Sequence, residues 1–513
     1  AEQARRQNAL EVAEQQYRIA LLGSGTSTPA LRFRILEGLG DVLILRGSYD
    51  AANEQLQAAR DLAPNDITRA RIDGKLGRSS LQKGDMGDAV VYLEKALTAL
   101  RERPPGSLPT LLPRLAKEGI VQMLHTLLPS RLVGRRRSDG PEGRTDLFRV
   151  RLLDDLTIAY WFSRTMELVL WAHLRQMNLA ERYPPTQELG RTYAFHAITM
   201  SAIPLARRGI EYAQRSHRIS VEAGDLWGQG KARSYHTFSC IVLARFEEGL
   251  RTGAEAVRLL EEAGDVWESN MARMIATVPM YHLGDLKTAS REAKKAYEIG
   301  LETGDYSAVC IALLFWIPCA PHLIPPGAIQ KELARDREDP LSIAGAVYAR
   351  GLELLLCEDN PAEAAHVLQE SLDRARKRGL RNVCIFSAAS WKATALRMVA
   401  ERAPKGQERK RAVKAARRAC REALRMTRSY QACRPHALRE SGIVAVLEGS
   451  EAAARRLFDE SLAVADRHGA RYEHAKTSRA RGEAGMHFGW DGAARQAAEA
   501  TALVRELENV TGP

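Results

Sequence analysis

Small and hydrophobic residues follow a helical spacing in the first part of the chain. Between residues 36 and 64 they occupy Leu36, Leu39, Gly40, Leu43, Gly47, Tyr49, Ala52, Leu56, Ala59 and Pro64. Steps of three and four residues on either side of a glycine predict two antiparallel helices joined by a short turn. Gly40 and Ala52 let the helices approach closely, and Gly47 permits the turn. Tyr49 and Leu56 fill the space between the helices.

A short phrase then returns every 40 residues in the middle of the chain. It is Ala-Gly-Asp-Leu-Trp at 223–227, Ala-Gly-Asp-Val-Trp at 263–267 and Thr-Gly-Asp-Tyr at 303–306. Self-similarity at such a period is typical of stacked supersecondary units, so we expect a series of helical hairpins.

The polar and aromatic members of this phrase have a structural explanation. Asp225, Asp265 and Asp305 each precede a helix, where a carboxylate can cap the free amides. We therefore expect caps there rather than a metal site or catalytic residues. For Trp227 and Trp267 two interpretations stay open, packing between adjacent hairpins or stacking on a ligand.

The patterns divide the chain into five parts. A looser copy of the first hairpin surrounds Gly77 and Gly84, and the pattern breaks after Pro105. A single long helix is expected from about residue 152 to 183. The expected parts are N-terminal hairpins at 1–130, a basic loop at 131–146, central hairpins of 40-residue period at 147–320, a proline-rich connection at 321–340, and C-terminal hairpins with a capping helix at 341–513.

The composition agrees with a folded, all-helical chain. Hydrophobic residues make up 45% of the 513 residues and charged residues 27%. The most apolar stretch, 308–320, is too short to cross a bilayer and contains Pro318. The polar start of the chain lacks an apolar leader. We therefore expect a cytoplasmic chain without a membrane span and, since no Met begins it, a piece of a longer polypeptide.

No residue pattern predicts catalysis, a cofactor or a metal ion. The glycine-rich segment at 23–28 lacks the lysine of a phosphate-binding loop, the spacing HExxH is absent, and Cys319 with His322 is expected to form a turn. The seven cysteines contain no CxxC pair and are expected to be reduced and mostly buried. Aromatic residues at 160–171 are expected to belong to the core rather than to a ligand site.

Most of the net charge lies in one segment. The chain has 75 basic and 63 acidic residues, an excess of 12, and residues 402–434 contain 12 basic and two acidic ones, an excess of 10. Six of these cations recur at steps of three and four residues, so they share one helical face beside an apolar seam at 413–424. They are Lys410, Lys414, Arg417, Arg421, Arg425 and Arg428.

Several roles stay open for this basic face. It can be a solvated surface that keeps an alanine-rich helix soluble, or it can meet an acidic protein or adjacent domain, a nucleic-acid backbone or anionic lipid. No aromatic residues interleave with the cations, which disfavours stacking on single-stranded nucleic acid. The three consecutive arginines at 135–137 form a second basic spot, either a flexible loop or a docking element.

The first hairpin resembles the tetratricopeptide repeat (TPR) in its Leu-Gly pair, turn glycine, aromatic residue, two alanines and final proline. With the stretch Leu-Glu-Gly-Leu-Gly-Asp-Val-Leu at 36–43, the chain resembles the C-terminal repeat region of bacterial multidomain signalling proteins. In these, a STAND-type AAA ATPase follows a class III nucleotide cyclase or a Ser/Thr kinase. The resemblance implies a right-handed superhelix of antiparallel hairpins that acts as a sensor, with the enzymatic domains elsewhere on the polypeptide.

The resemblance also implies partner-binding positions on the concave surface. By register with Gly40 and Gly77, these positions are Arg34, Glu37, Asp41 and Ile44, followed by Arg71, Gly74, Arg78 and Leu81. The TPR clamp for chaperone tails uses lysine and asparagine where this chain has Glu37 and Asp41. That departure disfavours a role as a chaperone adaptor.

The sequence thus predicts a non-catalytic, all-α, TPR-like solenoid that binds a protein partner or an effector and regulates a linked signalling ATPase or output domain. The alternative is a small-molecule sensor with its pocket inside the superhelix, as in TPR-containing transcription activators. The candidate partner-binding residues are Arg34, Glu37, Asp41, Arg71 and Arg78, and Lys410, Lys414, Arg417, Arg421, Arg425 and Arg428.

Overall fold

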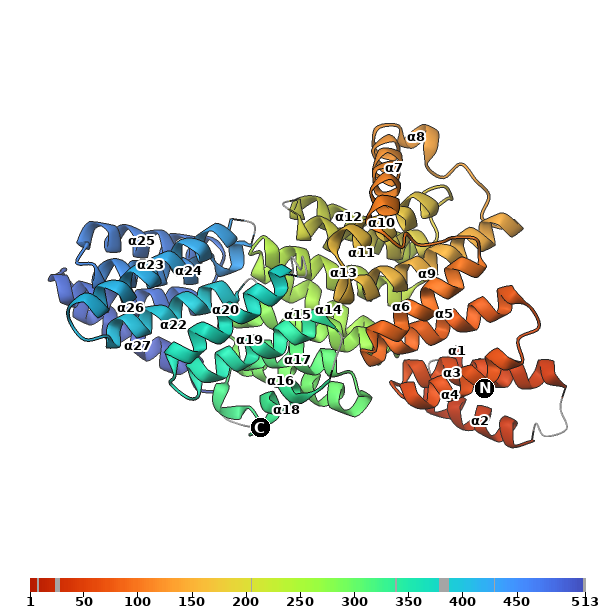
Figure 1. Ribbon diagram of the computed structural model, residues 1–513, viewed down its shortest axis with the longest axis horizontal. Coiled ribbons are helices and arrows are strands. Elements are labelled where there is room, and N and C mark those ends of the chain that lie inside the picture. Colours follow the sequence, from red (N-terminus) through yellow and green to blue (C-terminus); the bar gives the residue numbers. More distant parts are fainter. Residues whose placement is uncertain are drawn as a thin grey trace.

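The chain is an α-solenoid of stacked, TPR-like helical hairpins. The computed structural model describes residues 1–6, 9–23, 28–203, 205–336, 339–377, 387–428 and 430–510. These residues form helices and turns and contain no strand, which confirms the predicted fold class. Figure 1 shows an elongated stack with the N-terminal hairpins at one end and the C-terminal hairpins at the other.

The first hairpin forms where the hydrophobic spacing predicts it. Helix α3 (Pro29–Leu45) packs against α4 (Tyr49–Asp61), and Gly47 between them has a φ of +76°. A Cβ atom on Gly40 would lie 2.7 Å from the Leu56 side chain, so the close approach requires glycine. The other helices of this part are α1 (Glu2–Arg6), α2 (Leu10–Leu22), α5 (Asp66–Lys83), α6 (Met86–Ala99), α7 (Leu108–Leu127) and α8 (Pro129–Leu132).

The central part consists of hairpins whose first helices begin at the repeated phrase. Its helices are α9 (Pro141–Ser163), α10 (Met166–Ala180), α11 (Gln187–Ala202), α12 (Ala206–Glu222), α13 (Leu226–Val242), α14 (Phe246–Glu262), α15 (Val266–Leu283), α16 (Leu286–Thr303) and α17 (Tyr306–Trp316). The connection that follows contains η2 (Pro321–Leu323) and α18 (Ala328–Ala334). Asp225, Asp265 and Asp305 each accept a 3.0 Å hydrogen bond from the amide three residues later. The predicted caps are therefore confirmed.

The expectation of one long helix over 152–183 is wrong. Two helices, α9 and α10, cover this region and pack against each other. Arg164 between them has an extended backbone, with φ of −121° and ψ of −178°. Because neither glycine nor proline marks this break, the helical spacing continues across it in the sequence.

The C-terminal part continues the hairpins. Its helices are α19 (Pro340–Leu356), α20 (Pro361–Lys377), α22 (Ala388–Arg402), α23 (Gln407–Met426), η3 (Gln431–Cys433), α24 (Arg434–Leu447), α25 (Glu451–Arg467), α26 (Arg471–Phe488) and α27 (Ala493–Glu508). The expected capping helix is α27. Helix α20 ends at Lys377, and Gly379 just beyond it lies outside the described residues.

The stack closes on itself in its middle. Helix α9 contacts α19, α15 contacts α26, and α16 contacts α27. The inner faces of the central and C-terminal hairpins therefore meet across an aromatic interior instead of bordering an open channel. Open grooves lie elsewhere, including one beside α3 and α5 and one along α23.

Most of the described cysteines are buried in the stack. Cys240, Cys310, Cys319 and Cys420 are buried, Cys433 is half-buried and Cys357 is exposed, whereas Cys384 lies outside the described residues. Among the described helices, none combines the length and the apolar character needed to cross a membrane.

Candidate binding sites

A wide groove, here called the basic groove, runs along α23 between α20 and α22. It encloses about 2140 Å³. Five of the six cations predicted to share a face line it, namely Lys410, Lys414, Arg417, Arg421 and Arg425. Arg428 is exposed, beyond the end of α23, and does not line the groove. The seam residues Ala416 and Cys420 are buried and do not line the groove, whereas the buried Val413 lies at its floor.

The groove contains further cations that the helical spacing did not single out. Lys405, Arg409 and Arg418 belong to the same basic segment. Arg376 of α20 and Lys392 of α22 come from the opposite wall. Sequence reasoning missed these two because only the fold brings α20 and α22 beside α23.

The acidic residues of the groove are already neutralised. Glu422 forms ion pairs with Lys392 at 2.5 Å and with Arg376 at 3.3 Å, and Glu448 pairs with Arg417 at 3.4 Å. The cations that remain without an ion pair or side-chain hydrogen bond to any described residue include Lys410, Lys414, Arg421 and Arg425. An uncompensated row of positive charge in a concave surface concentrates positive potential there.

The five N-terminal candidate residues line a second groove, here called the N-terminal groove, which encloses about 720 Å³ between α3, α5 and α9. Each of them already has an ion-pair partner. The pairs are Arg34–Glu2 (2.8 Å), Arg71–Glu37 (3.0 Å), Arg5–Asp41 (2.5 Å) and Arg78–Asp265 (3.2 Å). This groove is therefore charge-balanced, in contrast to the basic groove.

A buried ionic cluster closes the inner end of the N-terminal groove. Lys231 is 1% exposed and lies 3.4 Å from Asp154 and 3.3 Å from Glu268. Burial alone would lower the pKa of Lys231, but these two carboxylates outweigh it and raise that pKa. Burial raises the pKa of the neighbouring Asp155 to about 6. No local sequence pattern marks this cluster, because its members lie far apart along the chain.

Trp227 lies between adjacent hairpins, as one of the two interpretations of this residue predicts. Its Nε1 donates a 3.0 Å hydrogen bond to Asp265 of the next hairpin. The ring is flanked by the guanidinium of Arg191 at 4.1 Å and the ammonium of Lys231 at 4.6 Å. Trp267 makes the equivalent side-chain hydrogen bond to Asp305.

An apolar cavity of about 160 Å³ lies where the inner faces of the hairpins meet. This volume is comparable to the roughly 150 Å³ engineered cavity that binds benzene in another protein. Phe162, which was expected in the core, is buried beside it, and Trp161 is half-buried at its wall. The aromatic and histidine side chains at its wall include Phe195, Tyr235, Trp267, Tyr281, His282 and Trp391.

His236, Cys240 and Glu248 form a trio whose ligand atoms lie within 4.8 Å of one another. Cys240 follows His236 by four residues on α13, and Glu248 comes from α14. The Nε2 atom of His236 lies 2.9 Å from Glu248, so the two side chains hydrogen-bond directly. Burial raises the pKa of the Cys240 thiol to about 12, which disfavours the thiolate that a metal ion requires.

The comparisons with known proteins add no family assignment. No protein-family model and no curated protein matches the chain. Similar solved structures include a Rap protein complexed with competence and sporulation factor, with a TM-score of 0.38 and 8% identity over 86% of this chain and 99% of that one. A STAND protein with a tetratricopeptide repeat sensor from Pyrococcus horikoshii has a TM-score of 0.32 and 12% identity, covering 92% of this chain and 83% of that one.

Yeast Tom70 has a TM-score of 0.30 and 14% identity, with 98% of this chain and 94% of that chain covered. These TM-scores are too low to carry an argument about function.

Proposed function

We propose that this chain is a non-catalytic scaffold whose basic groove binds an acidic segment of a protein partner. The observation that carries the proposal is the row of cations along α23 that have no ion pair to a described residue, facing a groove whose acidic residues are neutralised. A carboxylate-rich segment would supply the missing counter-charges, which steers association and fixes the register of the partner.

The lining of the groove favours a protein segment over nucleic acid. Its floor includes the apolar residues Leu396, Val413 and Leu447, and the described part of its lining contains no Phe, Tyr or Trp on which bases could stack. A segment with acidic and aliphatic residues matches both the cationic wall and the apolar floor. A solvated face, the plain alternative, would bind no acidic chain with measurable selectivity.

The test measures the binding of fluorescein-labelled polyglutamate by fluorescence anisotropy. We expect saturable binding that weakens with salt and is lost when Lys410, Lys414, Arg421 and Arg425 are changed to Glu. The matched control reverses four exposed cations that have no ion pair with a described residue and lie outside the groove, Arg207, Arg218, Lys287 and Arg456. If both variants lost the same amount of polyglutamate affinity, binding would depend only on the net charge of the chain, which would contradict the proposal.

Double-stranded DNA of similar charge is the competing probe. Binding of DNA that is tighter than binding of polyglutamate and is lost in the same groove variant would assign the groove to nucleic acid instead. The salt dependence of each probe counts the ionic contacts involved.

The resemblance to STAND-type signalling proteins extends the proposal. Partner binding in the groove would regulate an ATPase or another output domain linked on the same polypeptide. The discriminating observation is the coding sequence next to that of this chain. A continuous reading frame with nucleotide-binding motifs would support the extension, and a frame without an output domain would contradict it.

The apolar cavity supports a second candidate function, sensing of a small molecule. Tyr235 and Tyr281 line it, and no hydrogen bond joins either hydroxyl to a described residue, so each hydroxyl can donate to a ligand that carries an acceptor atom. Acetophenone and α-methylstyrene have the same shape, but only the first carries an acceptor. A larger thermal shift with acetophenone, lost in Tyr281→Phe but kept in the remote Tyr49→Phe, is expected. No shift with either compound would remove this candidate.

A further inference from the structure

Helix α7 projects from the side of the stack. Figure 1 shows α7 and α8 extending beyond the neighbouring helices. On the side facing the body, α7 buries Leu111, Glu118 and His125. Glu118 accepts a 2.7 Å hydrogen bond from Asn178 of α10, and His125 lies 2.8 Å from Glu181. These contacts fix which face of α7 points outward.

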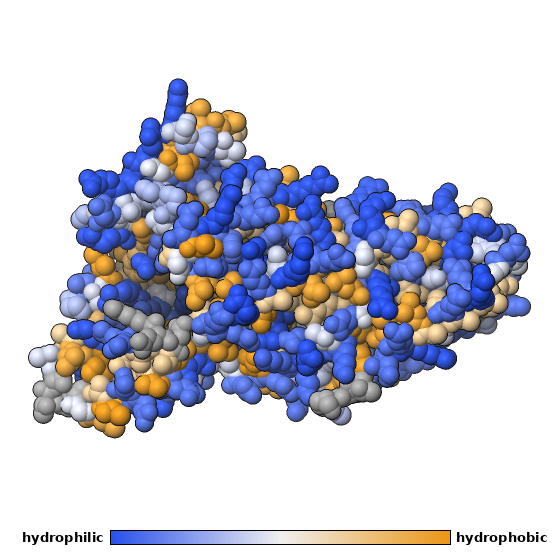
Figure 2. Space-filling view, turned by 180° about the vertical axis from the view of Figure 1, so that it is seen from behind, coloured by the Kyte–Doolittle hydropathy of each residue, from blue (hydrophilic) through white to orange (hydrophobic). Residues whose placement is uncertain are grey.

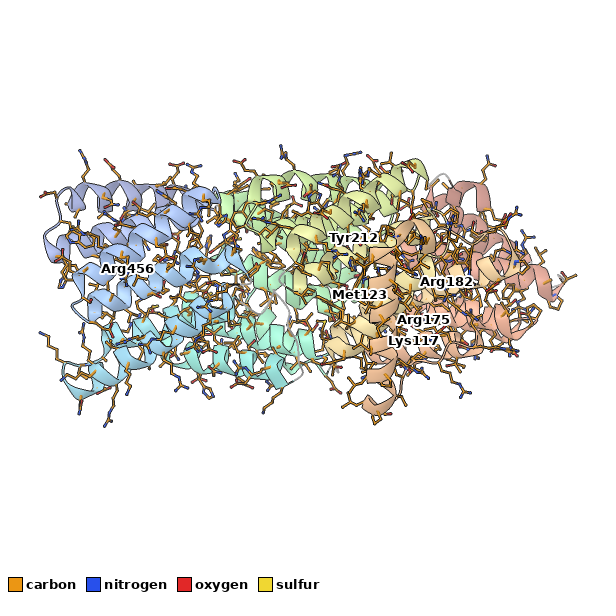
Figure 3. All side chains as sticks on the ribbon, turned by 90° about the horizontal axis from the view of Figure 1, so that it is seen from above. Lys117, Met123, Arg175, Arg182, Tyr212 and Arg456 are labelled. Carbon is orange, nitrogen blue, oxygen red and sulfur yellow. The ribbon has the colours of Figure 1, made fainter. Side chains whose placement is uncertain are left out.

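The outward face of α7 is almost entirely aliphatic. Ile120 is 56% exposed and Leu127 is 67% exposed. At 100° per residue, the exposed apolar residues of α7 fall within one arc of the helix. They are Leu108, Leu112, Ile120, Met123, Leu124 and Leu127, and Leu128 and Leu132 of the adjoining segment are also exposed. Figure 2 shows hydrophobic residues at the end of this projection, and Figure 3 views α7 from above with Lys117 and Met123 labelled.

Cations border this apolar face. Lys117 lies at its edge and is exposed, and the exposed arginines Arg131 and Arg135 follow just beyond the end of α7. Arg136 pairs with Glu142 at 2.8 Å and Arg137 with Asp139 at 3.6 Å, but Lys117, Arg131 and Arg135 form no ion pair with any described residue. The projection therefore combines an aliphatic face with a positive rim.

We propose that α7 and the basic segment after it lie on an anionic lipid surface. An amphipathic helix with an aliphatic face and cations around it is suited to the boundary between headgroups and acyl chains. The face is convex and projects from the stack, so no surrounding wall shapes a pocket for a ligand. A fluid membrane needs no such pocket in order to bind. Self-association through this face would bring the unpaired cations of two copies together, whereas anionic headgroups neutralise them.

The test is sedimentation of the chain with vesicles of phosphatidylcholine and phosphatidylserine in equal parts, compared with phosphatidylcholine alone. We expect binding only with phosphatidylserine present and a decrease with salt. Changing Ile120 and Leu127 together to Ser should lower the vesicle affinity by at least about tenfold, since burying each aliphatic side chain contributes about that factor. Both side chains are exposed, so circular dichroism and the melting temperature should stay unchanged.

Matched variants show whether vesicle binding depends on α7 and its basic segment in particular. Val221→Ser with Leu301→Ser changes two exposed aliphatic residues on α12 and α16 and should leave vesicle binding intact. Changing Lys117, Arg131 and Arg135 to Gln should weaken binding to phosphatidylserine vesicles, whereas the same change at Arg207, Arg218 and Arg456 should not. Failure of the wild-type chain to sediment overturns the proposal.

Two other outcomes also overturn it. In the first, vesicle binding is lost when Lys410 and Lys414 are changed to Glu but is unaffected in the α7 variant. That result would assign lipid binding to the basic groove. In the second, the wild-type chain binds no vesicles but forms a dimer in analytical ultracentrifugation, and the dimer disappears in the Ile120 and Leu127 variant. That result would assign the face to a second copy of the chain. Since the polyglutamate test uses a different surface, the two proposals fail independently.

Discussion

The indole Nε1 of Trp227 donates a 3.0 Å hydrogen bond to Asp265, the residue that caps the first helix of the next hairpin. Asp265 therefore accepts from its own helix with one oxygen and from the preceding repeat with the other. Arg78 of the N-terminal hairpins also reaches this second oxygen, at 3.2 Å. One carboxylate thus links three hairpins, and the same phrase that supplies it also supplies the indole.

Asp265→Ala should lower the free energy of unfolding by about 2 to 4 kcal/mol, because it removes a helix cap and a charged hydrogen-bond acceptor and leaves Arg78 without its partner. Asp285→Ala is the matched control. Asp285 caps α16 at 3.1 Å but is exposed, so about 1 kcal/mol is expected there. Urea denaturation measures both, and equal losses would show that the link between hairpins contributes nothing.

Stability should fall between about pH 4 and pH 7 because of Asp305. Burial raises the pKa of this carboxyl from 3.8 to about 7 in the folded chain. The folded state then holds the proton of Asp305 more tightly than the unfolded state, so protonation of Asp305 stabilises the fold. This contribution is complete below pH 3.8 and is lost as the pH rises through about 7. Asp305→Asn keeps an acceptor for the cap and should flatten this part of the profile. Melting temperatures across this range test it, and a slope that stays unchanged in Asp305→Asn would contradict it.

The C-terminal hairpins should lose stability in acid. Burial would raise the pKa of Glu440 and Glu473, but Arg397 and Arg439 beside Glu440, and Arg439 beside Glu473, outweigh it and hold both values at about 2. These depressed values stabilise the fold above pH 4.5, and the stabilisation is lost as the pH falls toward 2.

Glu473→Gln should weaken that acid dependence at a cost of about 3 to 5 kcal/mol at neutral pH, because it leaves Arg439 buried beside a neutral partner. Chemical denaturation at neutral and acidic pH measures both effects. A variant as stable as the wild type at neutral pH would contradict the buried ion pair.

The basic groove should cost the chain some stability. Lys414 has Lys410 and Arg418 four residues away on the same helix, and like charges at this spacing destabilise a helix by about 0.2 to 0.5 kcal/mol per pair. Lys414→Gln should therefore raise the melting temperature slightly while weakening polyglutamate binding. Arg456→Gln, a change of equal charge on α25, should not alter binding. A Lys414 variant that is both less stable and fully active in binding would contradict a binding role for this residue.

Gly40→Ala should destabilise the first hairpin by about 1 to 3 kcal/mol, because the added methyl group would overlap the Leu56 side chain at 2.7 Å. Gly119→Ala provides the opposite case. Its Cβ atom would meet nothing within 4 Å, so the gain in helix propensity should stabilise the chain by about 0.5 to 1 kcal/mol. Thermal unfolding of the two variants should therefore shift in opposite directions.

Local packing made the hairpins predictable from the sequence. Gly40, Gly47 and the repeated aspartates act within a few residues of their own position, so their spacing alone indicates the helices, turns and caps. The break between α9 and α10 escaped prediction because Arg164 leaves the helix without glycine or proline. The local sequence did not mark a change that neighbouring helices impose.

The candidate sites were only partly predictable for a related reason. The face of α23 follows from periodicity, and five of its six cations do line one groove. The opposite wall, the ionic cluster around Lys231 and the exposed face of α7 depend on which distant helix is adjacent. An apolar helical stripe in a sequence also gives no sign of whether it faces the core, and on α7 it faces outward.

The hydrogen bonds from Trp227 to Asp265 and from Trp267 to Asp305 give the repeat array a direction. Each indole reaches forward, toward the C-terminal neighbour, and each aspartate caps its own helix without help from the repeat behind it. Truncation from the N-terminal side therefore leaves every remaining cap and indole satisfied. Truncation between two repeats from the C-terminal side leaves an indole donor without its acceptor. Removal of a C-terminal repeat should therefore lower the stability of the remaining array more than removal of an N-terminal repeat.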